Sequence, residues 1–228
     1  MKSRDSRTIN LGEAYENLDQ KAYQIIKDMI EDRILLPGHK IPQEKLAKEL
    51  GISRTPLISA LKFLEHEKLV EVKPRRGFFV RLFTKKEMVS IFEIREVLEG
   101  LAARRSAQII SDEDCLTLLQ IFAPFKGMAD ITDIAAYSRA DRTFHTMITK
   151  MASREFLSSM LQTFNIISLA YQNVTTEGLI AHPNDTIQDH EQITQAICDR
   201  DPDGAEHLMK LHFKKTIDIL KQEIDDIE

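Results

Sequence analysis

Residues 43–64 read QEKLAKELGISRTPLISALKFL, and this stretch decides the fold of the N-terminal part of the chain. Its apolar residues recur every three or four positions on both sides of Gly51, as they do on one face of an amphipathic helix. A glycine in this position ends a helix, and Ser53 is a suitable N-cap for the next one. Pro56 falls in the first turn, where a missing N–H costs little. The stretch therefore predicts two short helices joined by a tight turn.

The flanking sequence adds a helix before this pair and a hairpin after it. An amphipathic helix is expected from Asp19 until the stop at Leu36-Pro37-Gly38. After Lys68, β-like stretches at 69–72 and 78–80 flank a basic loop of hairpin length. Three helices followed by a basic hairpin form the layout of a winged helix-turn-helix, which places its recognition helix in the major groove of DNA. The order of elements therefore predicts DNA binding.

The expected DNA contacts lie at the start of the recognition helix and on the wing. Arg54 suits a bidentate contact to guanine, and the neighbouring hydroxyls suit phosphates. The wing presents three cations around a glycine turn, as contacts to phosphates or to a narrow minor groove require. The predicted DNA-binding residues are Ser53, Arg54, Thr55, Lys73, Arg75, Arg76 and Gly77.

Charge is divided unequally along the chain. The net charge of −5 by itself argues against a nucleic-acid partner. Residues 1–83, however, carry 16 Lys and Arg against 12 Asp and Glu, a charge of +4, whereas the remainder carries 15 against 24, a charge of −9. This asymmetry indicates one part that meets a polyanion and one part that does not.

Strand patterns stop after Thr84, and the rest of the chain predicts helices only. Six amphipathic helices are expected, over 85–109, 112–124, 131–151, 154–176, 186–200 and 202–226. The expected fold is mainly α, with a winged helix-turn-helix of three helices and a small hairpin ahead of an antiparallel bundle of about six helices. The expected organisation is a flexible arm at 1–17, a DNA-binding domain at 18–81, a linker at 82–86 and a helical effector-binding domain at 87–228.

Membrane and secretory signals are missing from the sequence. No apolar run approaches the roughly 18 to 20 residues that span a bilayer, and the polar N-terminus lacks the apolar core of a signal peptide. The two cysteines, Cys115 and Cys198, form no CxxC pair. We expect two ordinary thiols in a protein of the cytoplasm rather than a redox switch.

Four side chains in the helical part are candidate metal ligands. Asp141 and His145 are four residues apart, which places them on one face of a helix. His190 and His212 lie 22 residues apart on two helices joined by a tight turn, about 11 residues on each side, so they can face each other across the hairpin. One carboxylate and three imidazoles suit Zn²⁺, Ni²⁺ or Mn²⁺. The alternative for the Asp–His pair is an ordinary hydrogen bond or salt bridge.

The N-terminal part resembles the GntR family of bacterial regulators. The resemblance is carried by residues 43–57, by Ala60-Leu61-x-x-Leu64-Glu65 and by Arg76-Gly77 of the wing. It implies that the helix-turn-helix binds an operator half-site and that the arginine and threonine at positions 54 and 55 touch DNA. Two departures matter: the family commonly has arginine where this chain has Ile58, and often a basic residue near Glu44. Each change removes an expected DNA contact.

A basic winged domain followed by six helices also resembles the FadR branch of this family, whose ligand domain is called FCD. The resemblance implies a metal held by Asp141, His145, His190 and His212, with Zn²⁺ expected and Ni²⁺ or Mn²⁺ as alternatives. It further implies open coordination sites for water or a small carboxylate effector. Arg95 is expected either to pair with that carboxylate or to form a salt bridge with Glu99. Asn165 and Tyr171 are further candidate effector-binding residues.

The expected function is that of a homodimeric bacterial repressor that binds a palindromic operator and responds to a small organic acid at its metal centre. Three alternatives stay open: the metal is itself the signal, the metal only staples the helices, or the site is that of a metal-dependent hydrolase. No nucleophile or general base accompanies the ligands in a recognisable motif, so we expect the protein not to be an enzyme.

Overall fold

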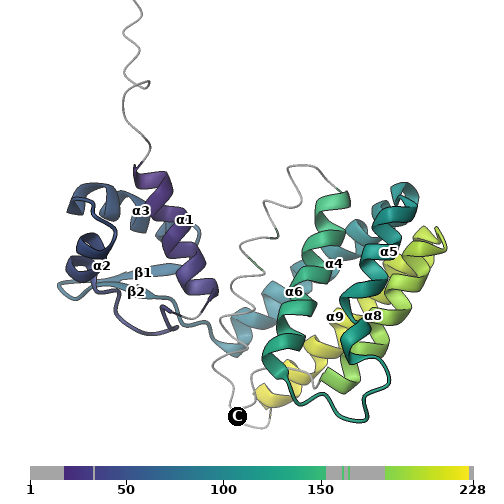
Figure 1. Ribbon diagram of the computed structural model, residues 1–228. Helices are drawn as coiled ribbons and strands as arrows, with labels where there is room; N and C mark the ends of the chain where they lie inside the picture. The colour runs from purple at the N-terminus through teal and green to yellow at the C-terminus, as the bar shows by residue number, and fades with distance from the viewer. Residues whose placement is uncertain (1–17, 33, 153–160, 162–163, 165–182, 226–228) are drawn as a thin grey trace, which may run out of the picture. The chain divides into compact units, whose positions relative to one another are not determined.

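The computed structural model describes residues 18–32, 34–152, 161, 164 and 183–225. It divides the chain into two compact units, Met1–Arg81 and Leu82–Glu228. The described part is mainly helical with one two-stranded sheet, which confirms the predicted fold class (Figure 1). None of the described helices is both long enough and apolar enough to cross a membrane.

The N-terminal unit is three helices and a hairpin. In chain order its elements are α1 (Leu18–Glu31), α2 (Gln43–Glu49), α3 (Arg54–His66), β1 (Val70–Lys73) and β2 (Gly77–Val80). The strands are antiparallel, and Val70 lies opposite Val80. The apolar stripes meet in a small core to which each element contributes, for example through Ile26, Leu46, Leu61 and Phe78. Burial of these stripes against one another is what makes such short helices stable.

Two glycines adopt the backbone conformations that the turn and the wing require. Gly51 has φ +64° directly after α2, and Ser53 is the extended N-cap residue of α3. Gly77 has φ +97° at the start of β2, and a Cβ there would lie 2.8 Å from Gln43 Nε2. A side chain at position 77 would therefore be strained in its backbone and would displace the end of the Gln43 side chain.

The C-terminal unit is a bundle built around its longest helix (Figure 1). Its elements are α4 (Lys85–Ile109), α5 (Asp112–Ile121), the 3₁₀ turn η1 (Ala123–Phe125), α6 (Ile134–Ala152), α8 (Pro183–Cys198) and α9 (Pro202–Asp225). Helix α4 packs against α6, α8 and α9, and α5 packs against α8. A capping box at Thr84 and Glu87 begins α4, which therefore starts inside the stretch expected to be a linker. Of the helix expected at 154–176, the described residues include Leu161 and Phe164, which are both helical.

Three helix boundaries differ from the sequence-based expectation by three residues, namely the end of α5 and the starts of α6 and α8, and proline explains the first and the last. Helix α5 ends at Ile121 rather than at residue 124, and a 3₁₀ turn containing Pro124 follows it. Proline lacks an N–H and disfavours helical backbone in the residue before it. Helix α8 begins at Pro183 rather than at residue 186, because proline is well suited to the first position of a helix.

The two cysteines are paired, which corrects the expectation of two free thiols. A disulfide joins Cys115 on α5 to Cys198 at the end of α8, with 5.5 Å between the two Cα atoms. The two helices pack side by side, so residues 83 positions apart in the sequence come within bonding distance. Spacing alone could not reveal this pair, because no local motif links the cysteines.

Candidate metal centre and nucleic-acid interface

Four side chains from three helices converge inside the C-terminal unit. Asp141 and His145 come from α6, His190 from α8 and His212 from α9, and one potential ligand atom from each lies within 4.8 Å of the others. The three histidines are buried, whereas the Asp141 side chain is 25% exposed. The structure therefore brings together all four residues that the sequence singled out. Nitrogen and carboxylate donors at this spacing are the chemistry of a divalent transition-metal site.

The α8–α9 hairpin sets the distance between two of these residues. Arg200 takes a left-handed conformation with φ +56°, and the Asp201 carboxylate accepts a hydrogen bond from the backbone N–H of Gly204 at 3.0 Å. The chain therefore reverses within three residues between the two helices. The rings of His190 and His212 face each other across the hairpin with centroids 4.6 Å apart.

The ring nitrogens of two histidines are arranged as metal binding requires. In His145, Nδ1 contacts Glu99 Oε2 and Nε2 faces Asp141 Oδ1 at 3.8 Å. In His190, Nε2 faces the same Asp141 oxygen at 3.3 Å and makes no hydrogen bond within the described part of the chain. A buried polar atom without a hydrogen bond is costly, and a bound cation removes that cost. The residues present therefore fit a metal.

Burial keeps two of the rings in the metal-binding form. Burial lowers the pKa of His190 well below its ordinary value, and the nearby His212 and His145 lower it further. Burial also lowers the pKa of His212. Neutral imidazole, not imidazolium, is the form that donates a lone pair to a cation. Both rings are consequently prepared to act as ligands at neutral pH.

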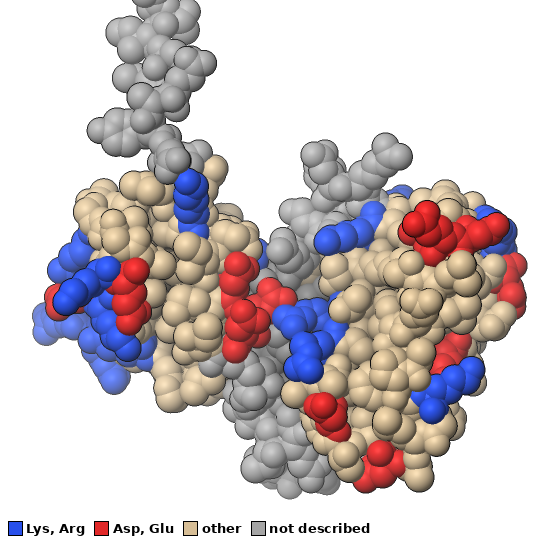
Figure 2. Space-filling view, viewed as in Figure 1, with Lys and Arg blue, Asp and Glu red and all other residues tan. Residues whose placement is uncertain are grey.

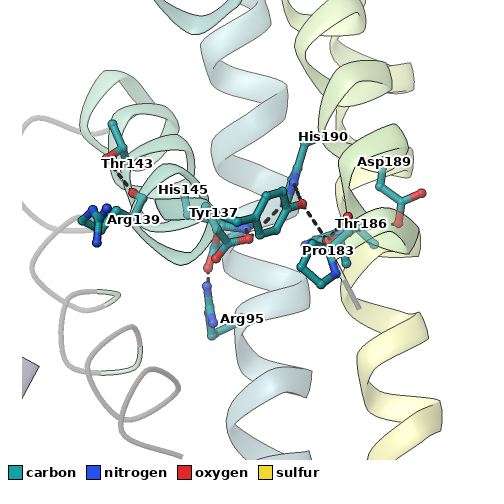
Figure 3. A network of polar contacts seen from close by, with 12 residues as sticks. Arg95, Tyr137, Arg139, Thr143, His145, Pro183, Thr186, Asp189 and His190 are labelled. Carbon is teal, nitrogen blue, oxygen red and sulfur yellow. Dashed lines mark hydrogen bonds and ion pairs between the residues drawn. The ribbon is translucent and has the colours of Figure 1, made fainter. Parts of the chain in front are cut away.

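Each histidine has a second polar residue at its Nδ1 atom, and these three partners were missed as site residues from the sequence. Glu99 on α4 contacts Nδ1 of His145. The hydroxyl of Tyr137 on α6 lies 3.1 Å from Nδ1 of His190 (Figure 3). Asp189 on α8 faces His212 at 3.5 Å. Partners of this kind orient a ligand ring and fix which nitrogen carries the proton.

A signal for one of these partners was present in the sequence. Glu99 is a charged residue within the apolar run Leu98-Glu99-Gly100-Leu101-Ala102-Ala103 of a predicted helix. An acidic side chain on a buried helical face requires a partner. The partner on its own helix is Arg95, and the partner on α6 could be found only from the three-dimensional structure.

The negative charges around the cluster are largely matched by cations. Arg95 Nε donates to Glu99 at 2.8 Å, and its guanidinium lies over the rings of Phe92 and Phe213 at 5.3 and 4.7 Å. Lys215 donates to Asp189 at 2.6 Å. Among the described residues Asp141 is the remaining carboxylate at the cluster, so a divalent cation bound there would leave a net charge of one positive unit. The candidate effector residues Asn165 and Tyr171 lie outside the described residues.

The second functional surface is a basic cleft on the N-terminal unit. The cleft has a volume of about 560 Å³ and is lined by the start of α2, the start of α3 and the wing, with the cations Lys40, Lys45, Arg54, Arg75 and Arg76. Lysine and arginine gather on this face of the unit, where α2 and the end of the hairpin lie in Figure 1 (Figure 2). A concave, cationic surface at a helix-turn-helix suits the phosphates of duplex DNA.

The residues expected to contact DNA are available at this surface. Ser53, Arg54 and Thr55 are exposed at the start of α3, and the Ser53 side chain makes no capping hydrogen bond. Arg75 and Arg76 are exposed at the tip of the wing. Lys73 instead pairs with Glu71 at 2.8 Å. Two cations of the cleft, Lys40 and Lys45, were missed from the sequence because they lie outside the recognition helix and the wing.

Glu44 occupies a significant position in this surface. Its carboxylate lies 3.8 Å from Arg54 Nη1, and both side chains are largely exposed. An exposed pair of this kind is weak, so the arginine remains free to exchange its partner for DNA. The departure from the family pattern noted above therefore lies directly beside the main expected base contact.

Comparison with known proteins assigns a family to each unit. Residues 18–80 match the family described as bacterial regulatory proteins, gntR family, and residues 90–215 match the FCD domain. The HTH-type transcriptional regulator YdhC of Bacillus subtilis is 27% identical over 207 residues, which cover 90% of this chain and 91% of that protein. The HTH-type transcriptional repressor RspR of Escherichia coli is 21% identical over 205 residues, 90% of each chain.

Solved structures agree on the fold. Escherichia coli McbR/YncC superposes with a TM-score of 0.73 and 21% sequence identity, covering 92% of this chain and all of the other. The matched proteins are transcription regulators and not enzymes, as we expected from the absence of a catalytic motif.

Proposed function

Because the chain belongs to the GntR family of DNA-binding transcription regulators and carries an FCD domain, we propose a specific mode of regulation for it. In this proposal the protein is a homodimeric repressor in the bacterial cytoplasm that binds a palindromic operator. A small organic acid, bound at a divalent metal in the helical unit, releases it from DNA. The observation that carries the proposal is the convergence of Asp141, His145, His190 and His212 on one point.

The basic cleft supports the DNA-binding half of the proposal. Arg54, at the N-terminal end of the recognition helix, would contact a guanine edge, and Ser53 and Thr55 would bind the adjacent phosphates. Arg75 and Arg76 at the wing tip would follow the neighbouring backbone or minor groove. Lys40 and Lys45 add positive charge to the lining of the same cleft.

Charge balance at the cluster supports an anionic effector. The cation supplies positive charge and coordination positions for a carboxylate. Arg95 offsets Glu99 and Lys215 offsets Asp189, so a divalent ion beside Asp141 retains about one unit of positive charge. In a buried site this charge attracts an anion far more strongly than it would in water. Arg95 itself is engaged with Glu99, so its role in binding the effector remains a prediction.

The number of ligands bears on the choice of metal. Four protein ligands complete a tetrahedral Zn²⁺ site, although zinc can expand to five ligands when a further oxygen donor arrives. Ni²⁺ and Mn²⁺ commonly take more than four ligands and would leave positions open from the start. We propose Zn²⁺ on the basis of the three-histidine set.

Dimer formation is supported by an apolar stripe on α4. Ile94 and Val97 are 43% and 59% exposed, and Leu98 and Leu101 on the same face are half-buried. Four apolar residues at helical spacing on an open face are typical of a surface that another protein covers. A twofold pairing of α4 helices would bring two recognition helices to the two halves of a palindrome.

The experiment replaces two of the candidate ligands. In the double variant His190→Ala/His212→Ala we expect loss of Zn²⁺ binding, measured by metal analysis and chelator competition, and loss of the effector response. Operator binding, measured by fluorescence anisotropy, should persist because the basic cleft belongs to the separate N-terminal unit. His207→Ala, a substitution of a histidine outside the cluster, is the matched control.

Three outcomes separate the proposal from its alternatives. Normal release of DNA by organic acids from the double variant would contradict a metal-centred mechanism. Release of the wild type by Zn²⁺ alone, without any organic acid, would show that the metal is the signal. Unfolding of the double variant without any effect of acids on the wild type would assign the metal a structural role only.

A further inference from the structure

His190 is held by a chain of three polar groups that ends at a backbone carbonyl. The Tyr137 hydroxyl lies 3.1 Å from His190 Nδ1 and 2.7 Å from Thr186 Oγ1. Thr186 Oγ1 in turn donates to the carbonyl oxygen of Pro183 at 3.3 Å. The hydroxyl end of Tyr137 points to both His190 and Thr186, with the contacts drawn as dashed lines (Figure 3).

The direction of the protons in this chain is set by the Thr186 hydroxyl, which has a single proton and donates it to the carbonyl oxygen of Pro183. Thr186 must then accept the proton of Tyr137, and Tyr137 has no second proton to give to the histidine. The Tyr137 hydroxyl keeps its proton at neutral pH, as tyrosine ordinarily does. The remaining arrangement has His190 Nδ1–H donating to the Tyr137 oxygen.

The opposite direction is disfavoured by the other side of the ring. If Tyr137 donated to Nδ1, the imidazole proton would lie on Nε2. That nitrogen makes no hydrogen bond within the described residues, although Asp141 Oδ1 is 3.3 Å away. A buried N–H that forms no hydrogen bond with the acceptor beside it costs free energy, and it would also block the lone pair that a metal needs.

We propose that Tyr137 and Thr186 are positioning residues that fix the Nδ1–H tautomer of His190 and thereby set the metal affinity of the site. The proposal rests on the metal centre proposed above, but its first consequence concerns the metal-free protein. Neither residue is a candidate ligand. Their effect reaches the cation only through the imidazole ring, as outer partners of metal-bound histidines generally act.

The critical variant is Thr186→Val, which keeps the shape of the side chain and removes its hydroxyl. Tyr137 then loses its acceptor, and its proton becomes free to turn toward His190. Thr186→Ser restores the hydroxyl and should restore the wild-type behaviour. Thr143→Val is the matched control, because Thr143 also donates to a carbonyl of its own helix, that of Arg139 at 2.8 Å, but lies in no path to a histidine.

Two measurements test the proposal. Nitrogen-15 NMR of histidine-labelled, metal-free protein, assigned with His190→Ala, should show the Nδ1–H form in the wild type, Thr186→Ser and Thr143→Val. In Thr186→Val the Nε2–H form should appear. Chelator competition should show Zn²⁺ binding weakened about 10- to 100-fold in Thr186→Val and Tyr137→Phe, with unchanged affinity in the serine and control variants.

The outcomes distinguish failure of the relay, meaning the hydrogen-bond chain from His190 through Tyr137 to Thr186, from failure of the proposed metal site. An Nε2–H tautomer in the wild type, or wild-type Zn²⁺ affinity in a folded Thr186→Val, would overturn the relay. If the wild-type tautomer is Nδ1–H and Thr186→Val changes it, but no variant binds Zn²⁺, the relay stands and the metal proposal fails. Thermal unfolding of each variant confirms that the comparison is made between folded proteins.

Discussion

Glu99 connects two helices through a single carboxylate. It is fully buried, contacts Arg95 on its own helix and His145 on α6, and so joins the long central helix to a candidate metal ligand. Burial by itself would raise the pKa of this carboxyl, but the adjacent Arg95 and His145 outweigh it and hold the pKa at about 2. The side chain is therefore an anion, able only to accept, and this orients the His145 ring.

Replacing Glu99 by glutamine should weaken both the fold and the metal site. The substitution keeps the size of the side chain but leaves the Arg95 guanidinium buried without its counter-charge, which typically costs about 3 to 5 kcal/mol. Zn²⁺ affinity should fall about 10- to 100-fold, as chelator competition would measure. Glu93→Gln is the control, because Glu93 pairs with Lys221 at an exposed position of the same helix. Equal Zn²⁺ affinity in Glu99→Gln and Glu93→Gln would exclude this role.

The same residue predicts a dependence of stability on pH. Glu99 has a pKa lowered from 4.5 to about 2 in the folded protein, so its contribution is complete above the ordinary pKa and is lost as pH falls toward 2. The stability difference between wild type and Glu99→Gln should be constant from pH 8 to about pH 5 and should shrink below that. Urea unfolding at a series of pH values measures it. A difference that grew on acidification would contradict the assignment.

At the scale of helices and strands, the fold was predictable where a single residue or its immediate neighbours set the boundary of a helix. Gly51, Thr84 and Pro202 each mark a boundary through their own backbone or capping chemistry, and α4 was predicted at 85–109, as observed. The pairing of α8 with α9 was predictable because a three-residue turn leaves little freedom. These features depend only on residues that are neighbours in the sequence.

Other features depend on which helices become neighbours, and the sequence does not contain that information in local form. The four candidate ligands were found because two lie at helical spacing and two at equal distances from a turn. Tyr137 and Thr186, in contrast, are 49 residues apart and share no pattern. The prediction of two free thiols was wrong for the same reason, because the contact of α5 with α8 brings the two cysteines together.

The disulfide predicts a measurable coupling between α5 and α8. With 83 residues between the cysteines, the loop-entropy model gives about 4 to 5 kcal/mol of stabilisation relative to the reduced chain. Thiol titration of the unfolded, non-reduced protein should detect no free thiol on Cys115 and Cys198. Reduction, or Cys115→Ser/Cys198→Ser, should lower the midpoint of urea unfolding. Two titratable thiols in non-reduced protein would contradict the pairing.

At the scale of the whole molecule, the proposed function assigns different roles to the two units of the chain. The N-terminal unit holds the cations of the basic cleft, and the C-terminal unit holds the histidine cluster and the apolar stripe of α4. A ligand at the cluster regulates DNA binding only if its affinity differs between two arrangements of the protein. The proposed pairing of two chains would supply such arrangements, because it would fix the spacing of two recognition helices.

Placing a charge in the α4 stripe should separate the proposed dimer and impair operator binding. In Val97→Asp, light scattering after size exclusion should give the mass of a single chain, because the charge would have to be buried in the interface. Operator affinity should fall about 100-fold or more, since one half-site no longer assists the other. Leu116→Asp is the control, because Leu116 is similarly exposed at 62% but lies on α5. A dimeric Val97→Asp would place the interface elsewhere.

The α8–α9 hairpin restricts how this protein can change during evolution. One residue inserted between His190 and the turn, or between the turn and His212, would rotate that ligand by about 100° around its helix and remove it from the cluster. Descendants that keep the proposed metal centre should therefore preserve the 22-residue interval. A deletion in this interval would mark a lineage in which the proposed centre is lost.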